Sequence, residues 1–271
     1  MSFLQAIILG IIQGATEFIP VSSSGHLVAA PFIFNWSIPE DQLFAFDVLV
    51  QMGTLVAVLI FFWKDIINIT VGAFKGLKQP DRWKIFEVRI ALYLLIATIP
   101  AALFGILLKD VIESAFNSLT ATAIFLLLTA LILIIAEWGE KRQKDLKDMN
   151  WLDALVMGIF QVLALFPGIS RSGTTITGGM LKKMSRASAA RFSFLMSIPI
   201  MIGAGIIAFF DLSNVEGISA FVPMLIVGFI TSAAIGYLSI KWLLKYLANN
   251  PLYHFSYYLF VLGIFLLYIS S

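Results

Sequence analysis

Long apolar stretches with at most one charged residue constrain this chain more than any other feature. About 20 apolar residues cross a bilayer as a helix. Six stretches approach or reach that length: 44–63, 90–108, 119–136, 192–210, 221–240 and 254–269. With 60% hydrophobic residues, 13% charged residues and a mean hydropathy of +0.95, the chain is too apolar for a soluble domain. The sequence therefore predicts an all-α polytopic membrane protein that forms a single integral membrane domain over residues 1–271.

Two further apolar segments, 3–34 and 151–181, are interrupted in the middle. Pro20 lies in the first interruption and Pro167 in the second, each beside a cluster of Ser and Gly. Each half is short for a crossing, so we expect two re-entrant helical hairpins. Irregular backbone at membrane depth is tolerated only where it is buried in protein or lines a wet cavity. The two hairpins should therefore meet inside the molecule.

Basic residues gather in four loops, which the tendency of such loops to stay cytoplasmic places inside. These loops cover residues 64–89, 141–147, 182–191 and 241–245. The loop at Lys109 has one basic residue and the loop with Asp211 and Glu216 has none, so both are expected outside. With six crossings, both termini are then predicted to lie outside. The net charge of +2 gives no reason to expect a nucleic-acid partner.

The chain matches itself when it is shifted by 148 residues. The matches pair Gly10 with Gly158, Gln13 with Gln161, and Ser22, Ser24 and Gly25 with Ser170, Ser172 and Gly173. Isolated Phe matches are expected by chance in so apolar a chain, whereas a shared Ser-x-Ser-Gly at both interruptions is specific. We expect a first repeat over 1–136 and a second over 151–271, each with one hairpin and three transmembrane helices. The odd number of crossings makes this an inverted-topology repeat.

Among 18 basic and 16 acidic residues, Glu17 and Arg171 are predicted to lie well inside apolar segments. An ionisable residue at membrane depth is costly and is a functional candidate by default. One alternative is an ion pair that pins the hairpins together. Asp47 and Glu137 lie near predicted span ends and are interpreted as interfacial groups, while Gln51 is assigned to helix packing or to a cavity wall.

The residues around the two interruptions suggest a phosphate site. Glycines allow close backbone approach, hydroxyls donate, and the helix that follows presents free N–H groups. Arg171 adds a planar fork that suits phosphate oxygens. The predicted phosphate-binding residues are Ser22, Ser24, Gly25, Gly168, Ser170, Arg171, Ser172, Gly173 and Thr175.

At these residues the chain resembles the bacitracin-resistance type of undecaprenyl-diphosphate phosphatase. The shared motifs run from Gln13 to Glu17, from Pro20 to His26 and from Pro167 to Thr175. The resemblance implies hydrolysis of the polyprenyl diphosphate lipid carrier to the monophosphate. It also implies a bacterial cytoplasmic (inner) membrane, with the active site open to the outer side, and a divalent metal, Mg or Ca.

Residue by residue, the resemblance and the local chemistry predict Glu17, Ser23, His26 and Arg171 as catalytic, and Glu17 with Gln13 as metal ligands. Gln13 is neutral, which leaves one carboxylate and puts a two-carboxylate clamp in doubt. The nucleophile stays open between Ser23, His26 and a water. Inverted repeats also typify secondary transporters, so a polyprenyl-phosphate flippase or anion transporter is the alternative. A homo-oligomer is possible.

Overall fold

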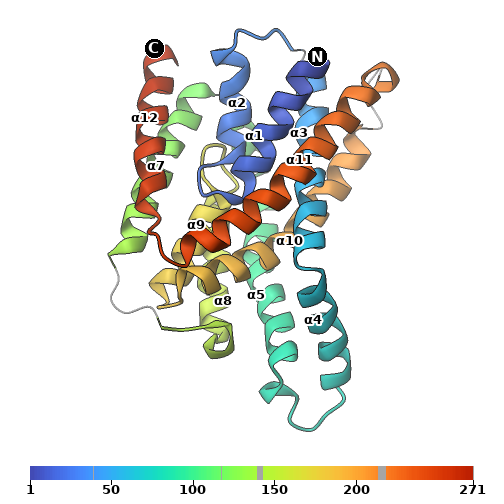
Figure 1. The fold of residues 1–271 in the computed structure, drawn as a ribbon, viewed down its shortest axis with the longest axis vertical. Coiled ribbons are helices and arrows are strands. Elements are labelled where there is room, and N and C mark those ends of the chain that lie inside the picture. Colours follow the sequence, from blue (N-terminus) through green and yellow to red (C-terminus); the bar gives the residue numbers. More distant parts are fainter. Residues whose placement is uncertain (39, 117, 139–142, 213–217, 271) are drawn as a thin grey trace.

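The computed structural model describes residues 1–38, 40–116, 118–138, 143–212 and 218–270, and these are almost entirely helical (Figure 1). The all-helical membrane fold expected from the sequence is confirmed. The α-helices are α1 Phe3–Phe18, α2 Ser23–Ile33, α3 Glu40–Phe61, α4 Trp63–Gly76, α5 Phe86–Leu107, α6 Lys109–Phe116, α7 Leu119–Glu137, α8 Trp151–Leu163, α9 Arg171–Leu181, α10 Arg186–Leu212, α11 Ile218–Leu247 and α12 Tyr253–Ser270.

Both interrupted segments form helical hairpins, α1 with α2 and α8 with α9. The first helix of each hairpin starts at a capping box, with Ser2 and Asn150 as the N-cap residues. The second helices, α2 and α9, are each 11 residues long and begin at Ser23 and Arg171, which are 148 positions apart. The shift seen in the sequence is thus reproduced in the helix boundaries.

Helix packing follows the same repeat. In the first half α1 packs on α11, and in the second half α8 packs on α5. The matched glycines make both approaches possible: a Cβ on Gly10 would lie 2.8 Å from the Gly228 carbonyl oxygen, and a Cβ on Gly158 would lie 2.6 Å from that of Ala97. Each hairpin therefore packs on a helix of the other repeat. The repeat bounds 1–136 and 151–271 stay a prediction.

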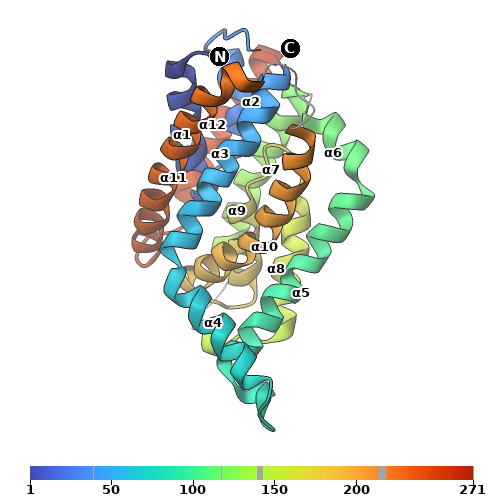
Figure 2. The same cartoon turned by 90° about the vertical axis from the view of Figure 1, so that its right-hand side faces the viewer.

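Five helices in the described part of the chain, α5, α7, α10, α11 and α12, are long and apolar enough to cross a bilayer. A sixth candidate, α3 with α4, bends by 71° at the break after Phe61. The expected loop after residue 63 is therefore helical at its start. Helix α4 has Asp65 in its first turn and Lys75 in its last, as the helix dipole favours, and it packs on α5 (Figure 2).

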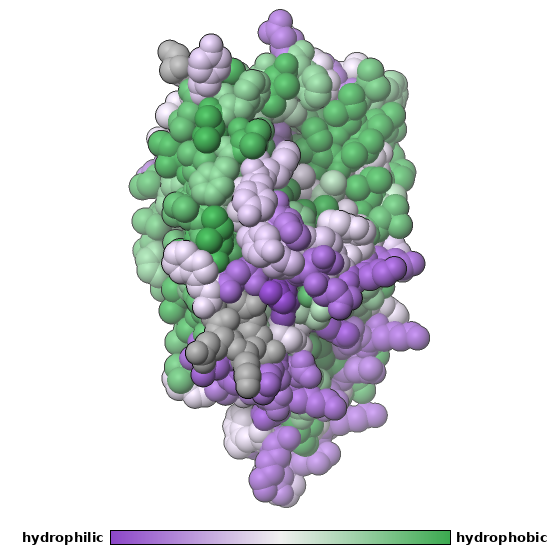
Figure 3. Space-filling model, turned by 60° about the vertical axis from the view of Figure 1, so that its left-hand side comes forward, coloured by the Kyte–Doolittle hydropathy of each residue, from purple (hydrophilic) through white to green (hydrophobic). Residues whose placement is uncertain are grey.

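The two ends of the molecule differ in polarity. Both termini lie at one end, and the turn between α4 and α5 lies at the other (Figure 1). On the face drawn in Figure 3, hydrophilic residues gather in the half nearer that turn, and the other half is mostly apolar. Termini at one end fit the predicted topology. Lys141, Arg142 and Glu216 lie outside the described residues, as does the side chain of Asp211.

Candidate active site

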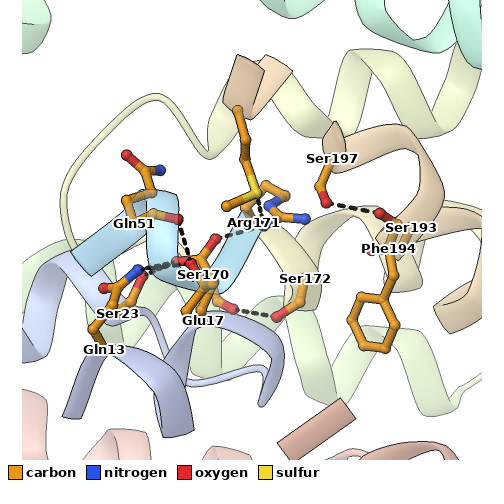
Figure 4. A network of polar contacts seen from close by, with 12 residues as sticks. Gln13, Glu17, Ser23, Gln51, Ser170, Arg171, Ser172, Ser193, Phe194 and Ser197 are labelled. Atoms are coloured by element: carbon orange, nitrogen blue, oxygen red, sulfur yellow. Dashed lines mark hydrogen bonds and ion pairs between the residues drawn. The ribbon is translucent and has the colours of Figure 1, made fainter. Parts of the chain in front are cut away.

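The hairpins meet at an ion pair between the two repeats. Nη2 of Arg171, the first residue of α9, lies 2.5 Å from Oε1 of Glu17 near the end of α1 (Figure 4). The Glu17 residue is 7% exposed, and the Arg171 side chain is 14% exposed. The two charges that the sequence placed at depth in different repeats therefore lie in contact.

Glu17 accepts hydrogen bonds from two further side chains. Gln13 Nε2 donates to Glu17 Oε2 over 2.9 Å, and Ser23 Oγ donates to the same oxygen over 2.7 Å. Gln13 lies one turn before Glu17 on α1, so the helix geometry brings the two side chains together. Together with Arg171, these donors orient the carboxylate, whose Oε2 accepts from the Ser23 hydroxyl.

The loop between α1 and α2 positions Ser23. Ser22 adopts a positive φ of 70°, a conformation that is unfavourable for a residue with a Cβ and typical of functional loops. Its side chain accepts from the Gly25 backbone N–H over 3.2 Å and so caps α2. Ser23 is therefore the first residue of α2, beside the free N–H groups of that helix.

The loop between α8 and α9 is held from α7. Thr129 Oγ1 donates to the Gly168 carbonyl oxygen over 3.0 Å and accepts from the Ser170 N–H over 3.2 Å. Ser170 in turn caps α9 by accepting from the Gly173 N–H over 3.1 Å. The two loops also touch, because the Gly168 N–H donates to Ser24 Oγ over 3.4 Å. The position of Arg171 is thus set by backbone contacts on both sides of the loop.

We expect Gly168→Ala to destabilise the protein. Gly168 has a φ of +90°, and an added Cβ would lie 2.3 Å from the Thr122 carbonyl oxygen. Backbone strain alone costs about 1–3 kcal/mol, and the overlap adds to it. Gly203→Ala is the matched control, because a Cβ there meets nothing within 4 Å. Thermal unfolding in detergent should show a lower midpoint for Gly168→Ala alone; equal midpoints would contradict the described loop.

Two adjoining cavities open at this ion pair. The larger, of about 560 Å³, is lined by Gln13, Glu17, Ser23, Ser24, Asp47 and Gln51 among others. The smaller, of about 300 Å³, shares Glu17, Ser23, Ser24 and Gln51 and adds Ser22, Gln161, Ser170 and Arg171. Nη1 of Arg171 is buried and has no hydrogen-bond partner in the described part of the chain. Arg171, which lines the smaller cavity, therefore has an N–H donor that no described group uses.

The predicted site residues separate into two groups. Those that line a cavity are Gln13, Glu17, Ser22, Ser23, Ser24, Ser170 and Arg171. The others, Gly25, His26, Gly168, Ser172, Gly173 and Thr175, are absent from both linings and support the loops or helix starts. Thr175 Oγ1, for example, is 2.6 Å from Ser193 Oγ and donates to the Arg171 carbonyl oxygen over 2.7 Å. Its hydroxyl is thus used within the protein.

Both ring nitrogens of His26 are occupied. Nδ1 lies 2.7 Å from the Ser22 carbonyl oxygen, and Nε2 lies 2.6 Å from the Tyr258 hydroxyl. Since the carbonyl only accepts, Nδ1 carries the proton and donates it. The His26 ring also stacks on that of Tyr258. In this geometry Glu17, not His26, contacts the Ser23 hydroxyl.

Two cavity residues were missed from the sequence. Asp47, interpreted there as interfacial, lines the larger cavity from α3, one turn before Gln51. Gln161, the counterpart of Gln13, lines the smaller cavity with a buried carbonyl oxygen that has no partner among the described residues. For Asp47 the spacing to Gln51 and Thr54 was the available signal, because it places three polar residues on one helix face.

Fold and site together define a multi-pass membrane protein in which two helical hairpins meet at a buried Glu–Arg ion pair in the wall of a cavity. The family model of the bacitracin resistance protein BacA matches residues 6–265, and the chain belongs to that family.

Relatives named undecaprenyl-diphosphatase cover nearly the whole chain. The protein of Methanosphaera stadtmanae is 42% identical over 100% of this chain and 99% of its own length. That of Moorella thermoacetica is 42% identical over 97% of this chain and 96% of its own length. That of Myxococcus xanthus is 40% identical over 98% of this chain and 89% of its own length. The resemblance seen in the motifs is thus confirmed over the full length.

Proposed function

We infer that this chain hydrolyses undecaprenyl diphosphate to undecaprenyl phosphate and inorganic phosphate. Membership of the family and the names of its relatives support this activity. The observation that carries it in the structure is the contact of Ser23, Glu17 and Arg171 at the wall of a cavity. The reaction recycles the lipid carrier of cell-wall synthesis and thereby gives resistance to bacitracin.

In the proposed first step, Ser23 Oγ attacks the terminal phosphorus. The bond from that phosphorus to the bridging oxygen breaks, and undecaprenyl phosphate leaves with the electron pair. The proton of Ser23 passes to Glu17 Oε2, which already accepts its hydrogen bond. Arg171 Nη1 donates to the phosphoryl oxygens, where charge spreads in the loose transition state.

In the second step, water attacks the phosphoserine. Glu17 holds the proton from the first step and returns it to Ser23 as phosphate leaves, and it accepts a proton from the attacking water, which it releases to bulk water before the next turnover. His26 acts in this proposal as a positioning residue, because its ring is anchored to the Ser22 carbonyl oxygen and thereby holds the loop that carries Ser23. The hydroxyls of Ser22, Ser24 and Ser170 are the nearest candidates for binding further phosphate oxygens.

A divalent cation, Mg or Ca, is part of the proposal. No group of three or more His, Asp or Glu side chains suited to a metal occurs among the described residues. Such ions are often held by one or two carboxylates together with substrate phosphates. The carboxylate of Glu17 and the amide of Gln13, in one cavity wall, fit that pattern. When bound, the cation would offset the negative charge of the diphosphate.

For membrane placement we propose an inner membrane with both termini and the site opening outside. The tendency of Lys- and Arg-rich loops to stay inside supports this orientation. The chain has no cysteine, so single cysteines at Ser2, Lys78 and Ser271 can be labelled without background. We expect an impermeant reagent to reach positions 2 and 271 in intact cells and position 78 only after lysis. Labelling of the two termini from opposite sides would contradict the inverted repeat.

The activity is tested by phosphate release from a long-chain polyprenyl diphosphate by purified protein in detergent, where transport cannot be scored. We expect phosphate release that depends on a divalent cation, and we expect each protein molecule to turn over many times. A flippase or anion carrier without hydrolase activity predicts no release under these conditions. Absence of release from a folded preparation would therefore overturn the phosphatase assignment.

A further inference from the structure

Asp47, near the start of the sixth candidate span, carries a carboxylate for which the proposed reaction has so far given no role. It lies on α3, and its Oδ1 is buried without a hydrogen-bond partner among the described residues. It lines the larger cavity together with Gln13, Glu17 and Gln51. These four residues come from two neighbouring helices, α1 and α3, which pack against each other.

The charges around this cavity are unbalanced. The described residues of its lining include two carboxylates, Glu17 and Asp47, and no Lys, Arg or His. Arg171 lies in the adjoining cavity, where Glu17 already pairs with it. An ionised carboxylate in such surroundings is strongly unfavourable unless a cation or a proton compensates it. Asp47 therefore needs a partner that the described side chains do not supply.

The shape and donor types of the cavity favour a hydrated divalent cation as that partner. Carboxylates and side-chain amide oxygens are the ligands that Mg and Ca prefer. The walls offer the two carboxylates with the amides of Gln13 and Gln51, and the cavity of about 560 Å³ leaves room for water and phosphate oxygens. If Asp47 were neutralised by a proton instead, the amide oxygens of Gln13 and Gln51 would have no cation to bind.

We propose that Asp47 is the second carboxylate ligand of the divalent cation, together with Glu17 in the lining of the larger cavity. This inference rests on the proposed cation dependence of the phosphatase. It explains how a chain with the neutral Gln13 in the first motif can still clamp a cation between two carboxylates. Gln13 then has two functions: its Nε2 donates to Glu17 and orients it, and its amide oxygen is a candidate cation ligand.

The test is calcium binding to the substrate-free protein in detergent, measured by calorimetry. We expect Asp47→Asn to weaken binding at least about tenfold, the loss typical even for outer partners of metal ligands, and Asp47→Glu to retain most of it. The matched control is Asp153→Asn, because Asp153 is also buried with an unpartnered Oδ1 but pairs with Lys144 outside the cavities. We expect its calcium affinity to stay within about twofold of the wild type, since no cavity ligand is lost.

Several results would overturn the assignment. These are unchanged affinity in Asp47→Asn, an equal loss in Asp153→Asn, and no calcium binding by the wild type. If Asp47→Asn does not fold, calcium binding to Gln13→Glu is measured instead. A third carboxylate in the same cavity should raise calcium affinity several-fold. Unchanged affinity would count against a cation site in this cavity. Phosphate release by the wild type is measured separately, so the activity can hold while this assignment fails.

Discussion

Arg171→Ala should lower phosphate release from polyprenyl diphosphate at least about 10³-fold, in the range found when a transition-state arginine is lost. The guanidinium contributes one nitrogen to Glu17 and has a second, buried nitrogen without a hydrogen-bond partner among the described residues. Its removal takes away the donor to the phosphoryl oxygens. Arg171→Lys should recover little, because an ammonium group cannot reach Glu17 and the phosphate as a planar fork does. Single-turnover rates at saturating lipid measure the effect.

Stability must be separated from turnover in this experiment. Arg171→Ala leaves a buried Glu17 charge unpaired, at a cost of about 3–5 kcal/mol. The double variant Glu17→Gln with Arg171→Ala removes both charges and should regain much of the thermal stability while staying inactive. If the double variant regained activity together with stability, the pair would act only as a structural pin between the hairpins.

Ser23→Ala should lower turnover at least about 10³-fold, as Arg171→Ala does. The reason is that removal of the nucleophile leaves only binding and electrostatic stabilisation. Ser24→Ala is the matched control in the same loop: its hydroxyl is 3.3 Å from Ser22 Oγ and accepts from Gly168 N–H, and it makes no described contact with Glu17. We expect a loss below about tenfold for Ser24→Ala, in line with one neutral hydrogen bond. Equal losses in both variants would remove the distinction between nucleophile and binding residue.

The hairpin fold was predictable because its signals are local. Pro20 and Pro167 mark the interruptions, and the serines that follow cap the next helices. The shift of 148 residues predicted two equivalent hairpins, and in the structure Ser23 and Arg171 begin equivalent helices. Glu17 and Arg171 stood out because charge is rare in the apolar segments. These features depend on local backbone chemistry and on the cost of charge in lipid, and the residues responsible for both can be identified in the sequence.

Helix orientation could not be predicted in the same way. A membrane helix is apolar on its lipid face as well as its protein face, so mean hydropathy does not tell which side of α3 faces inward. The spacing of Asp47, Gln51 and Thr54 was a signal, but Asp47 was interpreted from its position near the predicted span end instead. Asp47 was therefore assigned to the interface, although α1 and α11 pack on α3 and place Asp47 at the cavity. The direction of His26 likewise depends on Tyr258, which lies 232 residues away.

The most direct test of the central proposal is to locate the phosphoryl group during turnover. The protein is mixed with polyprenyl diphosphate labelled in its terminal phosphate and quenched within a single turnover in a neutral denaturant, because acid would hydrolyse a phosphohistidine. It is then digested and analysed by mass spectrometry. The geometry of Ser23 against Glu17 predicts the label on Ser23. Label on His26, or no labelled residue while phosphate is released in the same mixture, would contradict it.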